Sequence, residues 1–196
     1  MWKKKILEIV KEFKHPAWGI SHFNRIYDLS LELAKAQNFD VDADSLYAAA
    51  FLHDIGAFEP FIQKGKDHSD VAVEICDEIL NSIEFPSEKI PLVKEIIKSH
   101  MFYAKLGESF ESKIFHDADT LDFMGTIGIT RILSIVGIDD WTPDLRSAIK
   151  LLERFSNDLP QSLITDKAQE IGKLRKKEME EFLKNLANQT NHFESI

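Results

Sequence analysis

The sequence predicts an all-α protein, and two observations support this. Apolar residues recur at intervals of three and four through the whole chain, while sustained alternation of apolar and polar residues, which strands would produce, does not occur. Capping residues, glycines and prolines divide the pattern into segments of helical length. A chain of 196 residues is long enough for one domain with a buried core. We therefore expect a single domain over residues 1–196.

The first half of the chain should contain the helices that matter most for function. They are expected over residues 20–36, 42–56, 69–80 and 86–100. Asp42 is the expected N-cap of the second, and Gly56 is placed to end it. His53 and Asp54 then lie at the C-terminal end of this helix.

In the second half of the chain, the sequence pattern predicts further helices over residues 110–123 and 129–136. Gly125 and Gly128 are the expected breaks between them. Two C-terminal helices are expected over about 143–188, after a motif-bearing core over about 18–136. Thr142-Pro143 is the expected start of the first, with proline at the first helical position. Thr165 is the expected start of the second.

Composition and charge exclude several classes of function. A hydrophobic fraction of 44% and a charged fraction of 29% are ordinary for a globular protein. The net charge of −9 repels nucleic-acid backbones and anionic lipids, so we expect neither a nucleic-acid polymer nor a membrane as partner. No apolar run approaches the ~20 residues of a membrane span, and we expect a cytoplasmic protein.

Six histidines and aspartates lie in or beside the expected helices and form a candidate metal site. They are His22, His53, Asp54, His68, His100 and Asp119. Imidazoles combined with carboxylates suit Mn, Fe, Zn, Co or Ni better than a site for Mg alone. Facing helices of a bundle can bring such residues together. The alternative for each is a hydrogen-bonded histidine or a surface carboxylate. That alternative suits Asp54 least, because an acid beside the apolar run 48–52 needs a partner.

Three sequence stretches carry a resemblance to a known family. They are Ser21-His22-Phe23-Asn24-Arg25, Leu52-His53-Asp54-Ile55-Gly56 and Asp117-Ala118-Asp119-Thr120-Leu121-Asp122. A histidine, an adjacent His-Asp pair and a distant aspartate resemble the HD-domain superfamily of metal-dependent phosphohydrolases. Residues 123–131 and 162–175 resemble its small stand-alone bacterial members. The resemblance covers about residues 15–185 and implies an HD-domain helical bundle with a C-terminal helical extension.

The resemblance also implies roles for individual residues. The implied metal ligands are His22, His53, Asp54 and Asp119, with Asp117 as the competing choice for the last position. The implied ion is divalent, and among Mn, Fe, Co, Ni, Zn and Mg we favour Mn. Two-metal members of the superfamily have extra histidines at the positions of His68 and His100, so the number of bound ions, one or two, remains open.

The expected chemistry is hydrolysis by an HD-type enzyme. A bound divalent ion lowers the pKa of its water toward ~7, so hydroxide can attack phosphorus. Asp54 would orient that water, while His68, His100 and Arg25 would stabilise charge on the phosphate. Asp122 and Glu59 are expected to be solvated or helix-capping carboxylates rather than partners of the ligands.

The expected substrate is a small phosphate ester or nucleotide, hydrolysed by a pyrophosphohydrolase or phosphatase reaction. In many HD proteins with a cyclic-dinucleotide role, the residue after the glycine that matches Gly56 is a lysine that contacts phosphate. This chain has Ala57 at that position. Lys64 or Lys66 are candidates to make the phosphate contact instead. Two alternatives remain: an HD-type di-iron oxygenase, which would consume oxygen, and a catalytically inactive nucleotide-binding regulatory module. Oligomeric state is left open.

Overall fold

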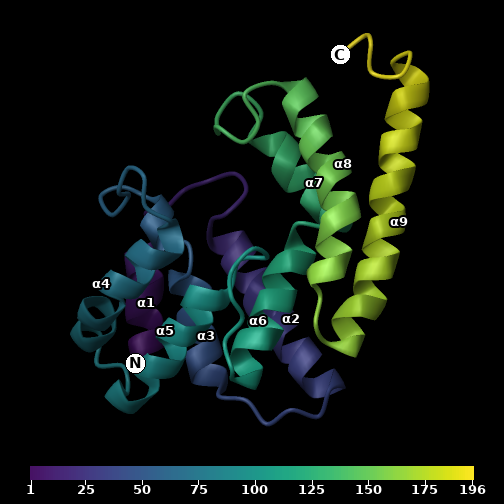
Figure 1. The fold of residues 1–196 in the computed structure, drawn as a ribbon. Helices are drawn as coiled ribbons and strands as arrows, with labels where there is room; N and C mark the ends of the chain where they lie inside the picture. Colours follow the sequence, from purple (N-terminus) through teal and green to yellow (C-terminus); the bar gives the residue numbers. More distant parts are fainter. The chain divides into compact units, whose positions relative to one another are not determined.

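The computed structural model describes residues 1–196, and all of its regular elements are helices (Figure 1). The predicted all-α fold class is therefore confirmed. The α-helices are α1 (Trp2–Val10), α2 (Ile20–Ala36), α3 (Ala43–Leu52), α4 (His68–Ser82), α5 (Ile90–Ser99), α6 (Phe110–Asp122), α7 (Gly125–Ser134), α8 (Leu145–Ser162) and α9 (Asp166–Gln189). Two short 3₁₀ helices, η1 (Ile55–Ala57) and η2 (Ser87–Lys89), precede α4 and α5.

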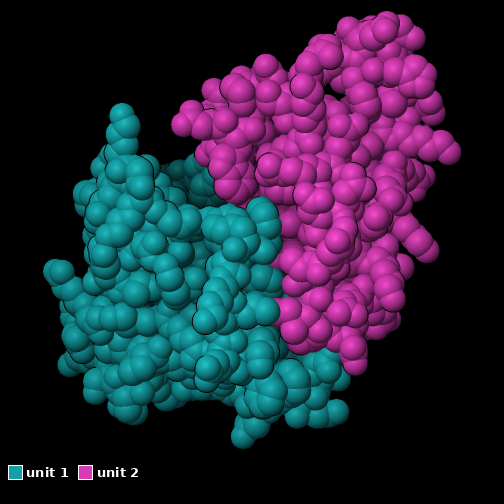
Figure 2. All heavy atoms as spheres, in the orientation of Figure 1, with its two compact units in different colours: residues 1–119 teal, residues 120–196 magenta.

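The contacts between residues divide the chain into two compact units, residues 1–119 and residues 120–196 (Figure 2). The boundary falls inside α6, near its C-terminal end. The expectation that residues 1–196 form a single domain stays a prediction.

Helix α3 lies at the centre of the first unit, where it contacts α1, α2 and α5. Ala48, Ala49 and Ala50 are completely buried, as are Leu46 and Phe51. A helix that is apolar on every side belongs in a core, and its alanines let neighbouring helices approach closely. The end of α3 is therefore held from several sides, and that end carries His53 and Asp54.

Capping at one end and a close approach at the other fix the position of α3. The Asp42 carboxylate accepts hydrogen bonds from the backbone N–H of Asp44 at 3.0 Å and of Ser45 at 3.3 Å, as predicted for an N-cap. At the other end, a Cβ added to Gly56 would lie 2.2 Å from the carbonyl oxygen of His68. Glycine at this position lets the first turn of α4 lie directly against η1, which brings His68 next to the His53–Asp54 turn.

The second unit consists of α7, α8 and α9 with the end of α6, and α9 contacts both α7 and α8. Its interior holds an ion pair between Arg131 and Asp122 at 2.8 Å, each side chain 3% exposed. The Arg131 guanidinium also lies 4.4 Å from the centre of the Phe123 ring. Both partners of this buried pair belong to the second unit.

Several expected helix boundaries are wrong. Helix α3 ends at Leu52 and not at Gly56, which lies in η1. The helix expected from residue 86 begins as η2 and becomes α-helical only at Ile90. Gly128 does not break a helix: α7 begins at Gly125, which has a φ of 68°, and Gly128 lies inside it. Thr142-Pro143 does not start α8, because the N-cap is Asp144, whose carboxylate accepts from the Ser147 N–H at 2.7 Å. The Thr142 hydroxyl instead donates to the carbonyl oxygen of Ile135 and closes the loop before α8.

None of the helices combines the length and the apolar character that crossing a lipid bilayer requires.

We predict that Asp42→Ala destabilises the protein by about 1–2 kcal/mol, because α3 loses its N-cap. The Asp42 carboxylate also pairs with Lys89 Nζ at 2.9 Å, and that pair would be lost as well. Urea denaturation measures the change. Asp40→Ala, at an exposed position two residues earlier, is the control and should change stability little. Equal losses in both variants would contradict the capping role.

Candidate metal centre

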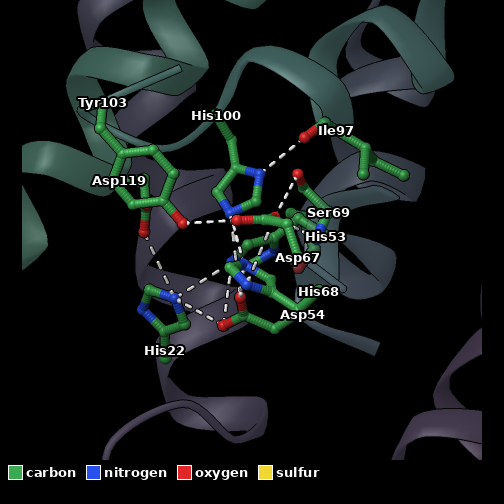
Figure 3. Close-up of polar contacts among 11 residues, drawn as sticks. His22, His53, Asp54, Asp67, His68, Ser69, Ile97, His100, Tyr103 and Asp119 are labelled. Carbon is green, nitrogen blue, oxygen red and sulfur yellow. Dashed lines mark hydrogen bonds and ion pairs between the residues drawn. The ribbon is translucent and has the colours of Figure 1, made fainter. Parts of the chain in front are cut away.

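Five helices bring the six predicted residues together in the first unit (Figure 3). His22 lies in the first turn of α2, and His53 and Asp54 follow the last residue of α3. His68 is the first residue of α4, His100 is the C-cap of α5, and Asp119 is in the last turn of α6. The site is therefore assembled from helix ends.

One side of the cluster contains His22, His53, Asp119 and one oxygen of Asp54. The Nε2 atoms of His22 and His53 are 3.1 Å apart. Asp54 Oδ2 lies 3.2 Å from His53 Nε2 and 3.5 Å from His22 Nε2. Asp119 Oδ1 lies 3.5 Å from His22 Nε2. Two imidazoles and two carboxylates thus point at one small volume.

The other side of the cluster contains His68, His100 and the second oxygen of Asp54. Asp54 Oδ1 lies 3.3 Å from His68 Nε2 and 3.9 Å from His100 Nε2. The two Nε2 atoms are 3.2 Å apart. The Asp54 carboxylate therefore stands between two pairs of histidines and turns one oxygen to each.

Backbone carbonyls set the orientation of two of these rings. His53 Nδ1 lies 3.0 Å from the carbonyl oxygen of Ala50, and His100 Nδ1 lies 2.6 Å from that of Ile97. A carbonyl oxygen only accepts, so each Nδ1 carries the proton and donates it. In the neutral ring, each Nε2 then presents a lone pair to the cluster, which is the arrangement of a metal-ligating histidine.

The donor set fits a divalent transition-metal ion. Ligand atoms about 2.0–2.2 Å from one ion lie about 3–3.6 Å from one another in octahedral or tetrahedral geometry. The distances from 3.1 to 3.5 Å among His22, His53, Asp54 and Asp119 match that spacing. Converging lone pairs and carboxylates repel unless a proton or a cation lies between them.

The charges of the cluster are strongly coupled. Burial opposes ionisation of Asp54, but the charge of His53 and hydrogen bonds from His22 and His53 hold its pKa well below the usual value. Burial likewise opposes protonation of His53 and His68, yet the adjacent Asp54 raises the pKa of both. Burial and the charges of His53 and His68 hold the pKa of His100 well below normal. These shifts favour the ionised form of Asp54 and the neutral form of His100.

Exposure to solvent increases across the cluster in one direction. The side chains of His53 and His100 are completely buried, that of Asp54 is 12% exposed and that of His68 is 21% exposed. A substrate would therefore reach the cluster from the side of His68, where Asp67 is 33% exposed.

Four further residues singled out in the sequence lie outside this cluster of histidines and aspartates. They are Arg25, Glu59, Lys64 and Lys66. Arg25 follows His22 by three positions on α2, so the two side chains lie on the same face. Lys66 pairs with the Glu74 carboxylate, while Lys64 and Glu59 are exposed.

The expectation of a solvated or helix-capping Asp122 is wrong. Its carboxylate is buried and lies 2.8 Å from the guanidinium of Arg131, which in turn packs over the Phe123 ring.

Asp67 and Tyr103 border the cluster, and the sequence motifs did not predict that they would. The Tyr103 hydroxyl donates to Asp67 Oδ2 at 2.8 Å. Burial opposes ionisation of Asp67, but hydrogen bonds from Ser69 and Tyr103 lower its pKa to about 2. The sequence did carry a signal for Asp67, an N-cap residue directly before α4. Tyr103 lies in the irregular segment after α5, where no periodicity indicates contacts.

The part of the chain that contains this cluster matches a known protein family. Residues 19–124, which contain all six residues of the cluster, match the HD domain. The chain belongs to the HD domain family. The family expected from the motifs is confirmed, as is the expected enzyme class of HD-type metal-dependent hydrolases.

Solved structures of similar fold agree with this family. A Lactobacillus plantarum protein matches with a TM-score of 0.72 and 21% identity, over 97% of each chain. Bacillus subtilis YpgQ in complex with ADP matches with a TM-score of 0.69 and 21% identity, over 95% of this chain and 97% of YpgQ. A predicted HD superfamily hydrolase from an uncultured Thermotogales bacterium matches with a TM-score of 0.65 and 23% identity, over 96% and 90%. At these identities the likeness establishes the fold.

No curated protein matches the chain.

We predict that His53→Gln and Asp54→Asn each abolish binding of Mn²⁺ while helical content stays near that of the wild type. Both side chains face the cluster, so their loss removes donor atoms without emptying the apolar core. Elemental analysis measures bound metal and circular dichroism measures helicity. His116→Gln is the matched control, since His116 is equally buried but its Nδ1 lies 3.3 Å from the carbonyl oxygen of Ser99. Full metal occupancy in both cluster variants would rule out the assignment.

A second pair of variants separates Asp119 from Asp117, both of which are buried. Positions two apart on a helix point to different sides, and Asp119 is the one grouped with His22 and His53. We predict that Asp119→Asn weakens Mn²⁺ binding at least tenfold and that Asp117→Asn changes it little. Titration calorimetry measures both affinities. The reverse order would show that the wrong aspartate was chosen.

Proposed function

We propose that this protein is a metal-dependent phosphohydrolase that acts on small nucleotides, with release of pyrophosphate from nucleoside triphosphates ahead of dephosphorylation of monophosphates. The observation that carries the proposal is the convergence of four histidines and two aspartates at helix ends, with its most exposed member, His68, facing solvent. Such a site would hold a cation beside groups that transfer protons.

In this proposal His22, His53, Asp54 and Asp119 hold one divalent ion, with Mn favoured. Their mixed nitrogen and oxygen donors also suit Fe, Co, Ni or Zn, and suit Mg less. When bound, such an ion acidifies a water molecule and polarises a phosphoryl oxygen, which makes hydrolysis possible without a nucleophile from the protein.

The protein's own side chains would position the reacting groups. Asp54, ionised and facing both pairs of histidines, orients the attacking water by accepting its hydrogen bond. His68, whose pKa Asp54 raises, is the partly exposed imidazole and donates to a phosphate oxygen. His100 Nε2 lies 3.2 Å from His68 Nε2 and restrains the orientation of that ring.

Arg25 completes the set of phosphate-binding groups in this proposal. A guanidinium presents several N–H donors in a plane and stays charged at any physiological pH. Its position three residues after His22 on α2 favours a contact with a phosphate at the edge of the cluster.

Two observations favour a free nucleotide over a polymeric substrate. The net charge of −9 repels long polyanions, whereas an ion with Arg25 and His68 can neutralise a compact group of phosphates. The Bacillus subtilis protein YpgQ, which has this fold, was solved in complex with ADP.

A centre with two ions is a second candidate. It is favoured by the two Asp54 oxygens, which lie toward separate histidine pairs as a bridging carboxylate would. Such a centre is compatible with hydrolysis and also with oxidation by a di-iron site. Turnover with Mn²⁺ in the absence of oxygen would identify hydrolysis.

The proposal predicts which products form. Purified protein loaded with Mn²⁺, Co²⁺, Ni²⁺ or Mg²⁺ is incubated with nucleoside mono-, di- and triphosphates, and phosphate and pyrophosphate are measured separately. We expect pyrophosphate from triphosphates as the main product with Mn²⁺, and a loss of at least 100-fold in Asp54→Asn. Activity confined to duplex DNA or structured RNA would contradict the proposal.

A further inference from the structure

Asp67 and Tyr103 form an anchored pair at the exposed edge of the cluster (Figure 3). Asp67 Oδ1 accepts from the backbone N–H of Ser69 at 2.8 Å and from its hydroxyl at 2.6 Å, while Oδ2 accepts from the Tyr103 hydroxyl at 2.8 Å. The carboxylate is fixed by the first turn of α4, so it fixes the tyrosine in turn. The chemistry proposed above uses neither residue.

The ring of Tyr103 remains open to solvent although its hydroxyl is anchored. The residue is 56% exposed, and the Phe102 ring packs against it edge-on with centroids 5.2 Å apart. A lone exposed apolar residue needs no explanation. Tyr103 differs because both ends of its side chain are restrained, so an aromatic surface is held in place with little conformational freedom left to lose on binding.

A cavity of about 450 Å³ borders the same two residues. Its lining includes Asp67, Ser69, Lys98, Tyr103, Lys105 and Leu106. This volume lies within the range of about 300–1,000 Å³ that is usual for small-molecule sites. Leu106, 40% exposed, adds a second apolar surface beside the tyrosine ring.

The position of the cavity relates it to the metal cluster. Asp67 lines the cavity and directly precedes His68, whose Nε2 is 3.3 Å from Asp54. A molecule whose phosphates reach His68 would therefore extend past Asp67 toward Tyr103. The part of the molecule that contacts Tyr103 would need a flat, largely apolar surface, because the exposed face of the tyrosine ring is itself flat and apolar.

We propose that Tyr103 is a specificity-determining residue on which the nucleobase of the substrate stacks, with the base in the cavity beside Asp67 and Leu106. The proposal rests on the proposed function, because it assumes a substrate with phosphates and a base. Stacking tolerates any base, since every base has a π face, so the site should discriminate weakly among nucleobases but strongly between nucleotides and phosphates without a base.

The test compares two ligands that differ only in the nucleoside. The probes are α,β-methylene-ADP and methylenediphosphonate, in which carbon replaces the bridging oxygen so that the phosphorus–phosphorus link is not cleaved. Their dissociation constants are measured by titration calorimetry on Mn²⁺-loaded wild type, Tyr103→Ala and Tyr103→Phe. Leu174→Ala, at a 57% exposed position on α9, is the control for loss of an exposed apolar side chain.

We expect Tyr103→Ala to weaken the methylene-ADP complex on the order of tenfold and to leave methylenediphosphonate within about twofold. Tyr103→Phe keeps the ring but loses the hydrogen bond to Asp67, so it should weaken the methylene-ADP complex less than Tyr103→Ala does. Leu174→Ala should stay near the wild type for both probes. Equal losses in Tyr103→Phe and Tyr103→Ala would show that the hydroxyl matters through Asp67, which overturns the stacking role. No effect of Tyr103→Ala, or an equal effect on both probes, overturns it too.

Failure of the proposed function would look different. If neither probe binds the Mn²⁺-loaded wild type, the phosphate site itself is wrong, and the base site falls with it. If both probes bind but Tyr103→Ala does not separate them, the phosphate site stands and only the role of Tyr103 is refuted.

Discussion

The buried Asp54 carboxylate is the group on which the rest of the site depends. It lies just after the buried helix α3, and its pKa is held well below the usual value although burial alone would raise it. A charge in such a place needs opposite charge or hydrogen-bond donors around it. Four histidines surround it, and two of them have their Nδ1 protons committed to backbone carbonyls. A bound cation would satisfy the remaining lone pairs and both carboxylates together.

The helices are arranged so that their ends meet at this carboxylate. The alanines of α3 let its neighbours approach closely, and Gly56 allows the start of α4 to lie against η1. Asp42 holds the opposite end of α3. Small residues and caps thus place His53, Asp54 and His68 within contact distance, although fourteen positions separate His68 from Asp54 in sequence. Function at such a site depends on backbone packing as much as on the ligands themselves.

Much of this arrangement could be predicted from the sequence, because the information is local. Apolar periodicity and the Asp42 and Thr165 caps predicted α2, α9 and the start of α3 nearly to the residue, whereas α3 ends four residues before Gly56. The motif residues predicted the members of the cluster. Contacts between elements could not be predicted. The hydrogen bond of Tyr103 to Asp67, and the pairing of Asp122 at the end of α6 with Arg131 on α7, depend on how these elements pack. Thr142 was misassigned because a threonine before proline suits both a cap and a loop closure.

Crystals grown with Mn²⁺ would test the central claim most directly, through the anomalous scattering of manganese. We expect one strong peak about 2.0–2.3 Å from Nε2 of His22 and His53 and from carboxylate oxygens of Asp54 and Asp119. A second peak near His68 and His100 would identify a two-ion centre. A peak at other residues, or none at the cluster with Mn²⁺ in excess, would contradict the claim that these histidines and aspartates form a metal site.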